Sequence, residues 1–130
     1  GIARGMRYLH HHGVLHRDLK GANVLLDAAG DAKIIDFGLS VLHEKSSPDG
    51  EWERQPVPFS GSRAYCAPEL LSNQAADGFA ADIWSLGICL FALATARFPF
   101  EEASENDPRY RVFLKAARDG TSPLRADTSH

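Results

Sequence analysis

Cysteine is scarce in this chain, and neither sign of charge dominates it. Cys66 and Cys89 are the only cysteines among 130 residues. Two isolated cysteines do not make the disulfide framework of a small secreted domain, so we expect reduced thiols and an intracellular setting, cytoplasmic or nuclear. The net charge of -3 at pH 7, with no basic stripe, predicts neither a nucleic acid nor an anionic membrane surface as a partner.

Long hydrophobic runs are also missing. The longest apolar run extends from Ile83 to Ala96. It is shorter than the roughly twenty residues that cross a bilayer, so it predicts a buried helix and no membrane span. The chain begins at Gly1 without an initiator methionine or a charged-then-apolar leader, so we expect a piece of a longer protein. Its length allows one domain, which we place at residues 1–120, with a frayed tail at 121–130.

The first third of the chain predicts a helix and a hairpin. Ile2, Met6 and Leu9 share one helical face, so residues 1–12 are expected to be helical. Apolar segments at 24–26 and 33–35 flank a polar turn that contains glycine, which is typical of a β-hairpin. Antiparallel strands would bring the start of the first segment and the end of the second to the same side of the molecule.

The rest of the chain predicts a long loop and two helices. Residues 39–58 are polar with almost no periodicity, which is typical of a long mobile loop. Asp82 is expected to begin a buried helix, apolar on all faces, that ends before residues 98–100. Asp107 and Pro108 predict the start of another helix, which closes at Gly120. Its predicted buried face consists of Tyr110, Phe113, Leu114 and Ala117. The fold class expected from these elements is α+β and mainly α-helical.

One short loop carries a carboxylate, a cation and an amide in the order His16-Arg17-Asp18-Leu19-Lys20-Gly21-Ala22-Asn23. Transfer of a phosphoryl group to a hydroxyl needs in-line placement, neutralisation of the phosphate charge and a carboxylate that accepts the proton. Asp18 is the candidate for that carboxylate. A single Asp is more often a turn or cap residue, so the hypothesis depends on the motifs that accompany it.

Two further motifs follow in chain order, Asp36-Phe37-Gly38 after the predicted hairpin and Ala67-Pro68-Glu69 after the long loop. Chance assembly of all three motifs with an aspartate-led apolar helix is improbable. The set resembles the large, C-terminal lobe of a eukaryotic protein kinase of the serine/threonine type over residues 1–118. The resemblance implies a partial protein-kinase-like large lobe, with a short β-hairpin that carries the catalytic and metal-binding loops.

The resemblance implies ATP and Mg²⁺ as cofactors. Lys20 would reach the transferring phosphate, and Asn23 and Asp36 would bind magnesium through oxygen atoms, which this ion prefers. Gly38 would give the backbone freedom to swing Asp36 in or out. Leu25 would form the lower surface against the adenine ring.

The resemblance also implies structural and regulatory positions. His16 would pack against Phe37 and be tied to Asp82. Arg17 corresponds to an arginine that in many such enzymes pairs with a phosphorylated residue of the activation loop. This chain departs from that pattern, because Pro58 stands three residues before Gly61, where regulated members often carry a threonine. The possible acceptors that remain are Ser46, Ser47 and Ser60.

The segment before the third motif is implied to receive the peptide substrate. Ser62 takes the place of a hydroxyl residue that hydrogen-bonds Asp18 and Lys20, which indicates serine/threonine specificity. Glu69 pairs in the family with a downstream arginine. None of the arginines near the end of this chain matches that context, namely Arg109, Arg111, Arg118 and Arg125.

The expected function is transfer of phosphate from ATP to serine or threonine hydroxyls of proteins, as part of a longer kinase. A glycine-rich loop and a Val-Ala-x-Lys strand are missing from the sequence, so the fragment alone is expected to bind nucleotide poorly and to be inactive. The alternative is a kinase-like scaffold or truncated pseudokinase that binds protein partners. A small-molecule phosphotransferase is a weaker third hypothesis, because enzymes of that class do not carry the motif that this chain has at 67–69. Metal binding by His16 and residues 10–12 is disfavoured, since consecutive histidines cannot all face one ion.

Overall fold

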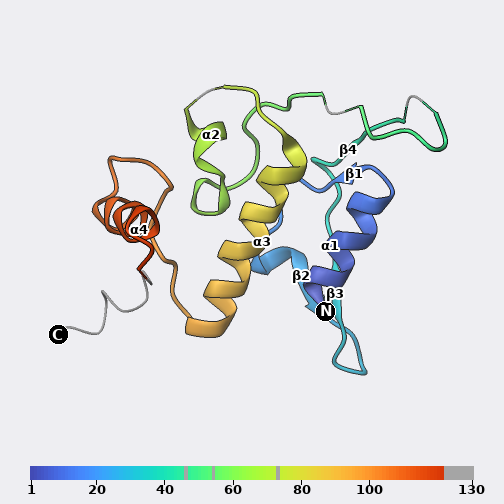
Figure 1. The fold of residues 1–130 in the computed structure, drawn as a ribbon. Coiled ribbons are helices and arrows are strands. Elements are labelled where there is room, and N and C mark those ends of the chain that lie inside the picture. The colour runs from blue at the N-terminus through green and yellow to red at the C-terminus, as the bar shows by residue number, and fades with distance from the viewer. Residues whose placement is uncertain (46, 54, 73, 122–130) are drawn as a thin grey trace.

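The structure is a computed structural model that describes residues 1–45, 47–53, 55–72 and 74–121. Helix α3 runs through the middle of the molecule, with α1 and the short strands on one side and α2 and α4 on the other (Figure 1). The elements in chain order are α1 (Ile2–His11), β1 (Val14–Leu15), the 3-10 helix η1 (Gly21–Asn23), β2 (Val24–Leu26), β3 (Ala32–Ile34), β4 (Val41–Leu42), the 3-10 helix η2 (Arg63–Tyr65), α2 (Pro68–Leu71), α3 (Gly78–Thr95) and α4 (Pro108–Arg118). The predicted tail at 121–130 lies, apart from Thr121, outside the described residues.

Helix α1 confirms the helix predicted for residues 1–12. Its buried side chains are Ile2 and Met6, four residues apart, and they join Leu19 and Cys89 in one core cluster. The helix ends at His11, and the chain turns at Gly13, whose φ of +76° is a left-handed conformation that glycine adopts without strain. This turn sends the chain into β1.

Two small antiparallel sheets lie beside α1. Strands β2 and β3 pair with Val24 opposite Ile34, which confirms the predicted hairpin, although β3 begins and ends one residue earlier than expected. Strands β1 and β4 pair with Val14 opposite Leu42. This second sheet joins segments far apart in the sequence and was not predicted.

The prediction of a long loop at 39–58 is confirmed for the described part of that segment, which is mostly irregular, but this loop is not without backbone pairing. Besides β4, an isolated bridge joins Lys45 to Trp52, and another joins Val57 to Ala76. The Lys45 ammonium lies 4.7 Å from the centre of the Trp52 ring. These pairings involve one or two residues each, too few to leave a period in the sequence, so composition alone suggested an unstructured loop.

Helix α3 begins earlier than predicted. Its N-cap is Asp77, whose carboxylate accepts the backbone N–H of Phe79, so the helix starts at Gly78 rather than at Asp82. Gly78 is packed tightly, because a Cβ there would lie 2.3 Å from the Leu15 side chain. The glycine lets the start of α3 approach β1 closely. Because Asp77 is the N-cap, the Asp82 carboxylate does not cap this helix and can bind another part of the chain.

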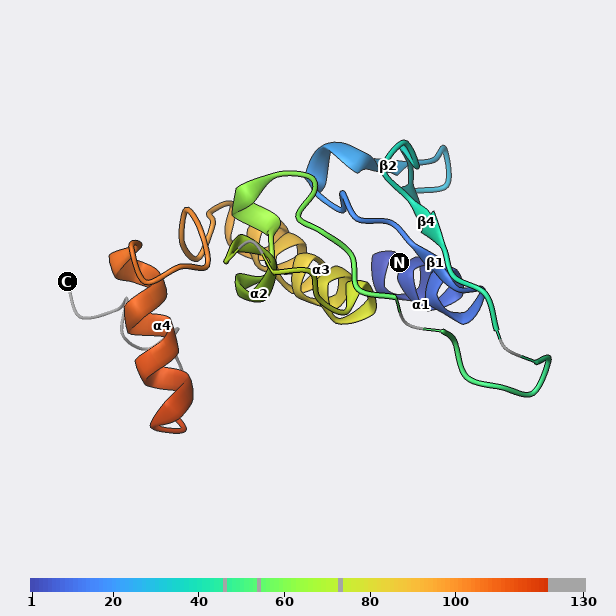
Figure 2. The same cartoon turned by 90° about the horizontal axis from the view of Figure 1, so that it is seen from above.

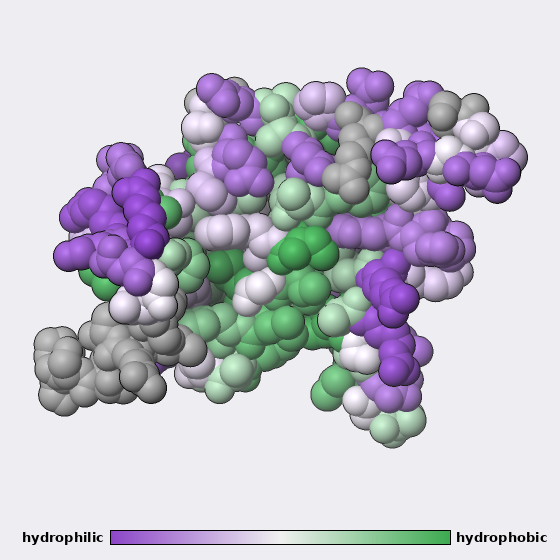
Figure 3. Space-filling view, in the orientation of Figure 1, coloured by the Kyte–Doolittle hydropathy of each residue, from purple (hydrophilic) through white to green (hydrophobic). Residues whose placement is uncertain are grey.

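The expectation that the helix apolar on all faces is buried holds for only part of α3. Ile83, Leu90 and Leu93 are 54%, 45% and 60% exposed, and hydrophobic residues gather over this helix in the space-filling view (Figure 3). Among the described residues, α3 is the one helix long and apolar enough to cross a membrane by length and composition, and 33% of it is buried. Core helices of soluble proteins have the same length and composition, so these properties do not assign it to a membrane.

Helix α4 lies at one end of the molecule, apart from the sheets (Figure 2). It confirms the predicted start, since the Asp107 carboxylate accepts the backbone N–H groups of Arg109 and Tyr110. Tyr110 packs with Ile88 and Phe100, and Phe113 and Leu114 lie against the same cluster. Ala117 is exposed, contrary to the prediction, and Ala116 is buried in its place, where its carbonyl accepts the N–H of Thr121.

Candidate functional site

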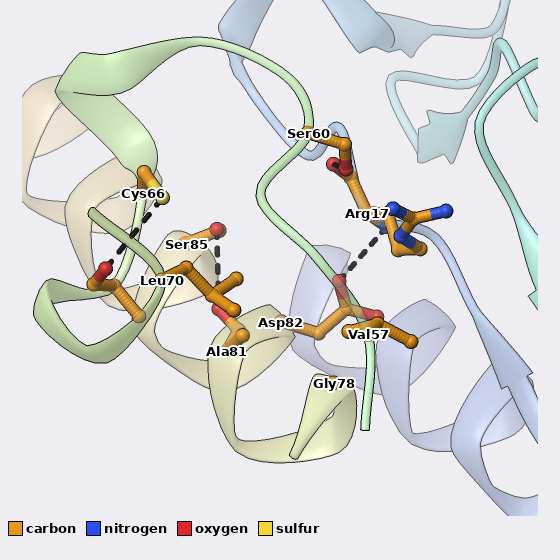
Figure 4. Close-up of a pocket in the computed structure, with 10 residues that line it drawn as sticks. Arg17, Val57, Ser60, Cys66, Leu70, Gly78, Ala81, Asp82 and Ser85 are labelled. Carbon is orange, nitrogen blue, oxygen red and sulfur yellow. Dashed lines mark hydrogen bonds between the residues drawn. The ribbon is translucent and has the colours of Figure 1, made fainter. Parts of the chain in front are cut away.

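The loop at 16–23 is anchored by a buried carboxylate on α3. Asp82 is 2% exposed and accepts the backbone N–H groups of His16 at 2.8 Å and Arg17 at 2.9 Å. Figure 4 shows Arg17 and Asp82 facing each other across this contact. Arg17 has a φ of +70°, which is unusual for a residue with a Cβ. The two hydrogen bonds from consecutive N–H groups hold the loop in this strained turn.

The His16 ring connects the two motifs that contain aspartate. It is fully buried, and its Nδ1 lies 3.1 Å from the backbone N–H of Asp18, which it accepts. The proton therefore sits on Nε2, which donates to the carbonyl of Ile35 at 2.9 Å. The ring also meets the edge of Phe37, with centroids 5.2 Å apart. The predicted packing against Phe37 is present, while the tie to Asp82 runs through the His16 backbone and not through its ring.

Asp18, Lys20 and Asn23 lie together at the end of this loop. The Asn23 amide group donates to the carbonyl of Asp18 at 2.8 Å and lies 3.4 Å from an Asp18 carboxylate oxygen. The Lys20 ammonium lies 3.9 Å from the other carboxylate oxygen. Since Asn23 uses its NH₂ group for these contacts, its side-chain oxygen remains available to a ligand.

The segment that was predicted to receive the peptide passes directly beside Asp18. A Cβ on Gly61 would lie 2.9 Å from the Arg17 carbonyl and 2.9 Å from an Asp18 carboxylate oxygen, and Gly61 has a φ of +79°. The Ser62 hydroxyl accepts from the Lys20 ammonium at 3.5 Å. The structure thus brings Ser62 to Lys20, whereas its predicted hydrogen bond to Asp18 is absent from the described contacts.

Asp36 is placed near the loop at 16–23 by the backbone hydrogen bonds of the preceding residue, Ile35. The N–H of Ile35 donates to the carbonyl of Asn23 at 2.9 Å, and the carbonyl of Ile35 accepts from His16. Asp36 has a φ of +60°, is exposed, and accepts the N–H of Gly38 at 3.2 Å. The hairpin therefore places Asp36 next to the loop that carries Asn23, as the sequence predicted from strand pairing.

The Arg17 side chain joins both ends of the 39–58 segment. Its two terminal nitrogens donate to the carbonyls of Leu39 and Pro58, each at 3.3 Å. Its Nε is buried with no partner among the described residues and lies at a cavity of about 20 Å³ that Asp82 and Ser85 also line (Figure 4). This cavity is far too small for a nucleotide, so the candidate site is the open surface around Asp18.

Other predicted residues do not join this cluster through a described contact. Leu25 is 52% exposed on β2. Glu69 lies exposed on α2, and no ion pair joins it to any residue that the structure describes. Ser60 donates its hydroxyl to the carbonyl of Arg17 at 3.2 Å. Ser47 is exposed, and the third proposed acceptor, Ser46, lies outside the described residues, as does Arg125.

Two features of the site were missed from the sequence. The His10 Nε2 lies 2.9 Å from an Asp82 oxygen, so the carboxylate has a third partner. The spacing of Ile2, Met6 and His10 could have revealed this inward position, because residues four apart share a helical face. The Tyr65 hydroxyl accepts the N–H of Gly21 at 3.3 Å and links η2 to the loop, a contact that no local pattern signals.

The two cysteines are free and buried, as expected for reduced thiols. Burial raises the pKa of the Cys66 thiol to about 11, with a further contribution from Glu69 that the nearby Arg63 partly offsets. Burial also raises the pKa of Cys89. Neither thiol is an activated nucleophile.

Comparison with known proteins agrees with these motifs. The family model for the protein kinase domain matches residues 1–125. The chain is 48% identical over 100 residues to CBL-interacting serine/threonine-protein kinase 17 of Arabidopsis thaliana, covering 77% of this chain and 22% of that protein. It is 44% identical over 115 residues to CBL-interacting protein kinase 26 of Oryza sativa subsp. japonica, covering 88% of this chain and 22% of that protein. The chain thus spans about a fifth of the length of these relatives.

Proposed function

Because the chain belongs to the protein kinase family, we propose that it forms part of the C-terminal lobe of an enzyme that phosphorylates serine and threonine residues of proteins. The relatives it matches are named as serine/threonine-protein kinases. A single observation carries the proposal: contacts shorter than 4 Å link Ser62 to Lys20, Lys20 to Asp18, and Asp18 to Asn23. Such a cluster can position a hydroxyl and neutralise a transferring phosphate.

Asp18 is proposed as the group that orients the acceptor hydroxyl and takes its proton. The hydrogen bond from its own N–H to His16 fixes the backbone, and the Asn23 amide fixes its carbonyl. Lys20, within 4 Å of the carboxylate, would neutralise charge on the transferring phosphate. These roles need both side chains on the open surface, where the structure leaves Asp18 and Lys20 partly exposed.

Asn23 and Asp36 are the proposed magnesium ligands. Both offer hard oxygen atoms, and the Asn23 oxygen is the part of that side chain that its amide hydrogen bonds leave free. No group of three His, Cys, Asp or Glu side chains arranged for a metal occurs in the described part of the chain. The pair fits magnesium in a nucleotide site, where one or two protein ligands and the phosphates bind the ion. When bound, the ion neutralises phosphate charge.

Substrate contacts are proposed on either side of this centre. Leu25, half exposed on β2, offers apolar surface to an adenine ring. The segment from Ser62 to Tyr65 would receive the peptide, because Lys20 and Gly21 both bond to it. Hydroxyl recognition by this segment supports serine/threonine acceptors over tyrosine. ATP and a protein substrate are therefore the proposed partners, and an intracellular location remains a prediction.

The experiment uses the full reading frame that contains these residues, with Mg-ATP and a generic protein substrate. We expect Asp18→Asn to lower the rate of phosphate transfer by about a hundredfold or more, because the amide cannot accept the proton. Asp31→Asn is the matched control, since Asp31 lies exposed in the turn between β2 and β3 and should leave the rate unchanged.

Two results would contradict the proposal. Phosphate transfer that survives Asp18→Asn would show that this carboxylate does not act in the reaction. A full-length protein that folds but transfers no phosphate would favour the alternative, a kinase-like scaffold that binds protein partners.

A further inference from the structure

Helix α4 concentrates positive charge in a chain that is negative overall. Between Pro108 and Arg118 the helix carries four basic residues and no acidic one, whereas the whole chain has a net charge of -3. The four cations are Arg109, Arg111, Lys115 and Arg118. None of them forms an ion pair with a carboxylate in the described part of the chain.

Three of these cations form a basic stripe, contrary to the expectation from the overall charge that the chain carries none. Arg111, Lys115 and Arg118 follow each other at spacings of four and three residues, which places them on one face of a helix. All three are exposed. The opposite face carries Tyr110 and Phe113, which pack on the core. Helix α4, which carries this stripe, lies at one end of the molecule (Figure 2).

Helix stability alone does not account for this stripe. Lys115 and Arg118 lie in the last turn, where cations interact favourably with the helix dipole. Arg111, by contrast, lies in the first half of the helix, and like charges spaced three or four residues apart repel each other. One terminal nitrogen of Arg111 donates to the Glu105 carbonyl at 2.6 Å, which ties this side chain to the loop before α4; a guanidinium has further N–H donors for a ligand.

The orientation of α4 is fixed relative to the substrate segment. Asp107 caps α4 with one oxygen and accepts the N–H groups of Glu101 and Glu102 with the other. The Glu102 carboxylate in turn accepts two hydrogen bonds from Arg63 in η2, at 2.9 and 2.7 Å. Burial raises the pKa of Asp107, but its four backbone hydrogen bonds outweigh this and lower it overall, so the cap stays charged at neutral pH.

We propose that the stripe formed by Arg111, Lys115 and Arg118 docks an acidic segment of a partner protein. The cations are spaced by about 6 Å and then about 4.5 Å along the helix axis, and carboxylates on one face of an extended peptide repeat about every 6.6 Å. Charge complementarity selects an acidic occupant. A polypeptide is favoured over a nucleic acid or a membrane, because a short acidic segment needs to meet only the stripe, whereas a duplex or a membrane surface would also extend its negative charge over the negative remainder of the chain.

The test measures binding of a fluorescently labelled peptide of Glu-Ser repeats to residues 1–130 by anisotropy at low salt. The charge-reversed variant Arg111→Glu/Lys115→Glu should bind about tenfold more weakly, because two attractive contacts become repulsive. The matched control is Arg4→Glu/Arg7→Glu on α1, which changes the net charge equally at two exposed positions and should bind almost as tightly as the unmodified chain. The neutral variant Arg111→Gln/Lys115→Gln should lose less than the reversal, and a thermal melt shows that each variant folds.

The proposal would be overturned by equal losses in the α1 and α4 variants, which would indicate diffuse attraction. It would also be overturned if duplex DNA or phosphatidylserine vesicles bound more tightly than the peptide through the same residues. Because the measurement involves no phosphate transfer, its outcome is independent of the proposed enzymatic activity.

Discussion

The loop at 16–23 and the motif at 36–38 differ sharply in how they are held. The loop is anchored through buried side chains, with His16 and Asn23 at 0% and 5% exposure. The motif at 36–38 is exposed, with Phe37 at 44%, and one described hydrogen bond, within the motif itself, involves the Asp36 carboxylate. The difference teaches that the fold holds the proposed proton acceptor through hydrogen bonds to its loop, while the second carboxylate stands exposed at the end of a hairpin with fewer contacts.

Removal of the anchor should have the largest effect. Asp82→Ala would leave the buried N–H groups of His16 and Arg17 without an acceptor, so we expect a loss of about 3 kcal/mol in the free energy of unfolding. Asp36→Ala, in the exposed motif, should cost less than about 0.5 kcal/mol. Urea denaturation of both variants measures the contrast, and similar losses in the two would break the comparison.

Substitution of Gly61 should have the next largest effect. Gly61→Ala places a Cβ 2.9 Å from the Arg17 carbonyl, in a left-handed conformation, so we expect a loss of about 2 to 3 kcal/mol. Gly30→Ala is the matched control, since Gly30 has a φ of +84° but open space around it, and should cost about 1 kcal/mol. If denaturation curves gave the same loss for both, the close approach to the loop would not contribute to stability.

The smallest expected effect is on the pH dependence of stability. It involves Asp107, which lies outside both the loop at 16–23 and the motif at 36–38, and so provides a reference for the comparison. Against the effect of burial, the pKa of Asp107 is lowered in the folded state by its backbone hydrogen bonds. Its contribution to stability is therefore complete above the pKa of an unfolded Asp, about 4, and is lost as the pH falls below that value through the lower folded pKa. Asp107→Asn should flatten the dependence of stability on pH over that range. A thermal melt series from pH 5 to pH 2 on both proteins measures this, and identical curves would contradict it.

Local patterns predicted α1, the β2–β3 hairpin and the start of α4, because each depends on neighbouring residues. The start of α3 was missed because Asp82 looks like a cap in the sequence, whereas Asp77 is the cap and Asp82 binds the distant loop. The β1–β4 pair joins two-residue strands far apart in the sequence, and no period reveals it. The exposed face of α3 was missed because its sequence is apolar all round.

The residues of the candidate site were predicted mainly from the three motifs and their order in the chain, and less from the predicted helices and strands. That order led to Asp18, Lys20 and Asn23, which the structure brings together. The contributions of His10 and Tyr65 were missed, since each depends on contacts across the fold. Motifs therefore identified the groups proposed to meet the substrate, while the residues that support them became visible in three dimensions.

The most direct test of the central claim is a double-mutant cycle on the rate of phosphate transfer by the full reading frame, with Asp18→Asn and Asp36→Asn. If the fixed loop and the exposed motif serve one reaction centre, each substitution should lower the rate by about a hundredfold or more, and the double variant should be no slower than the slower single one. Activity that survives either substitution, or losses that multiply in the double variant, would contradict the claim that these two carboxylates act together.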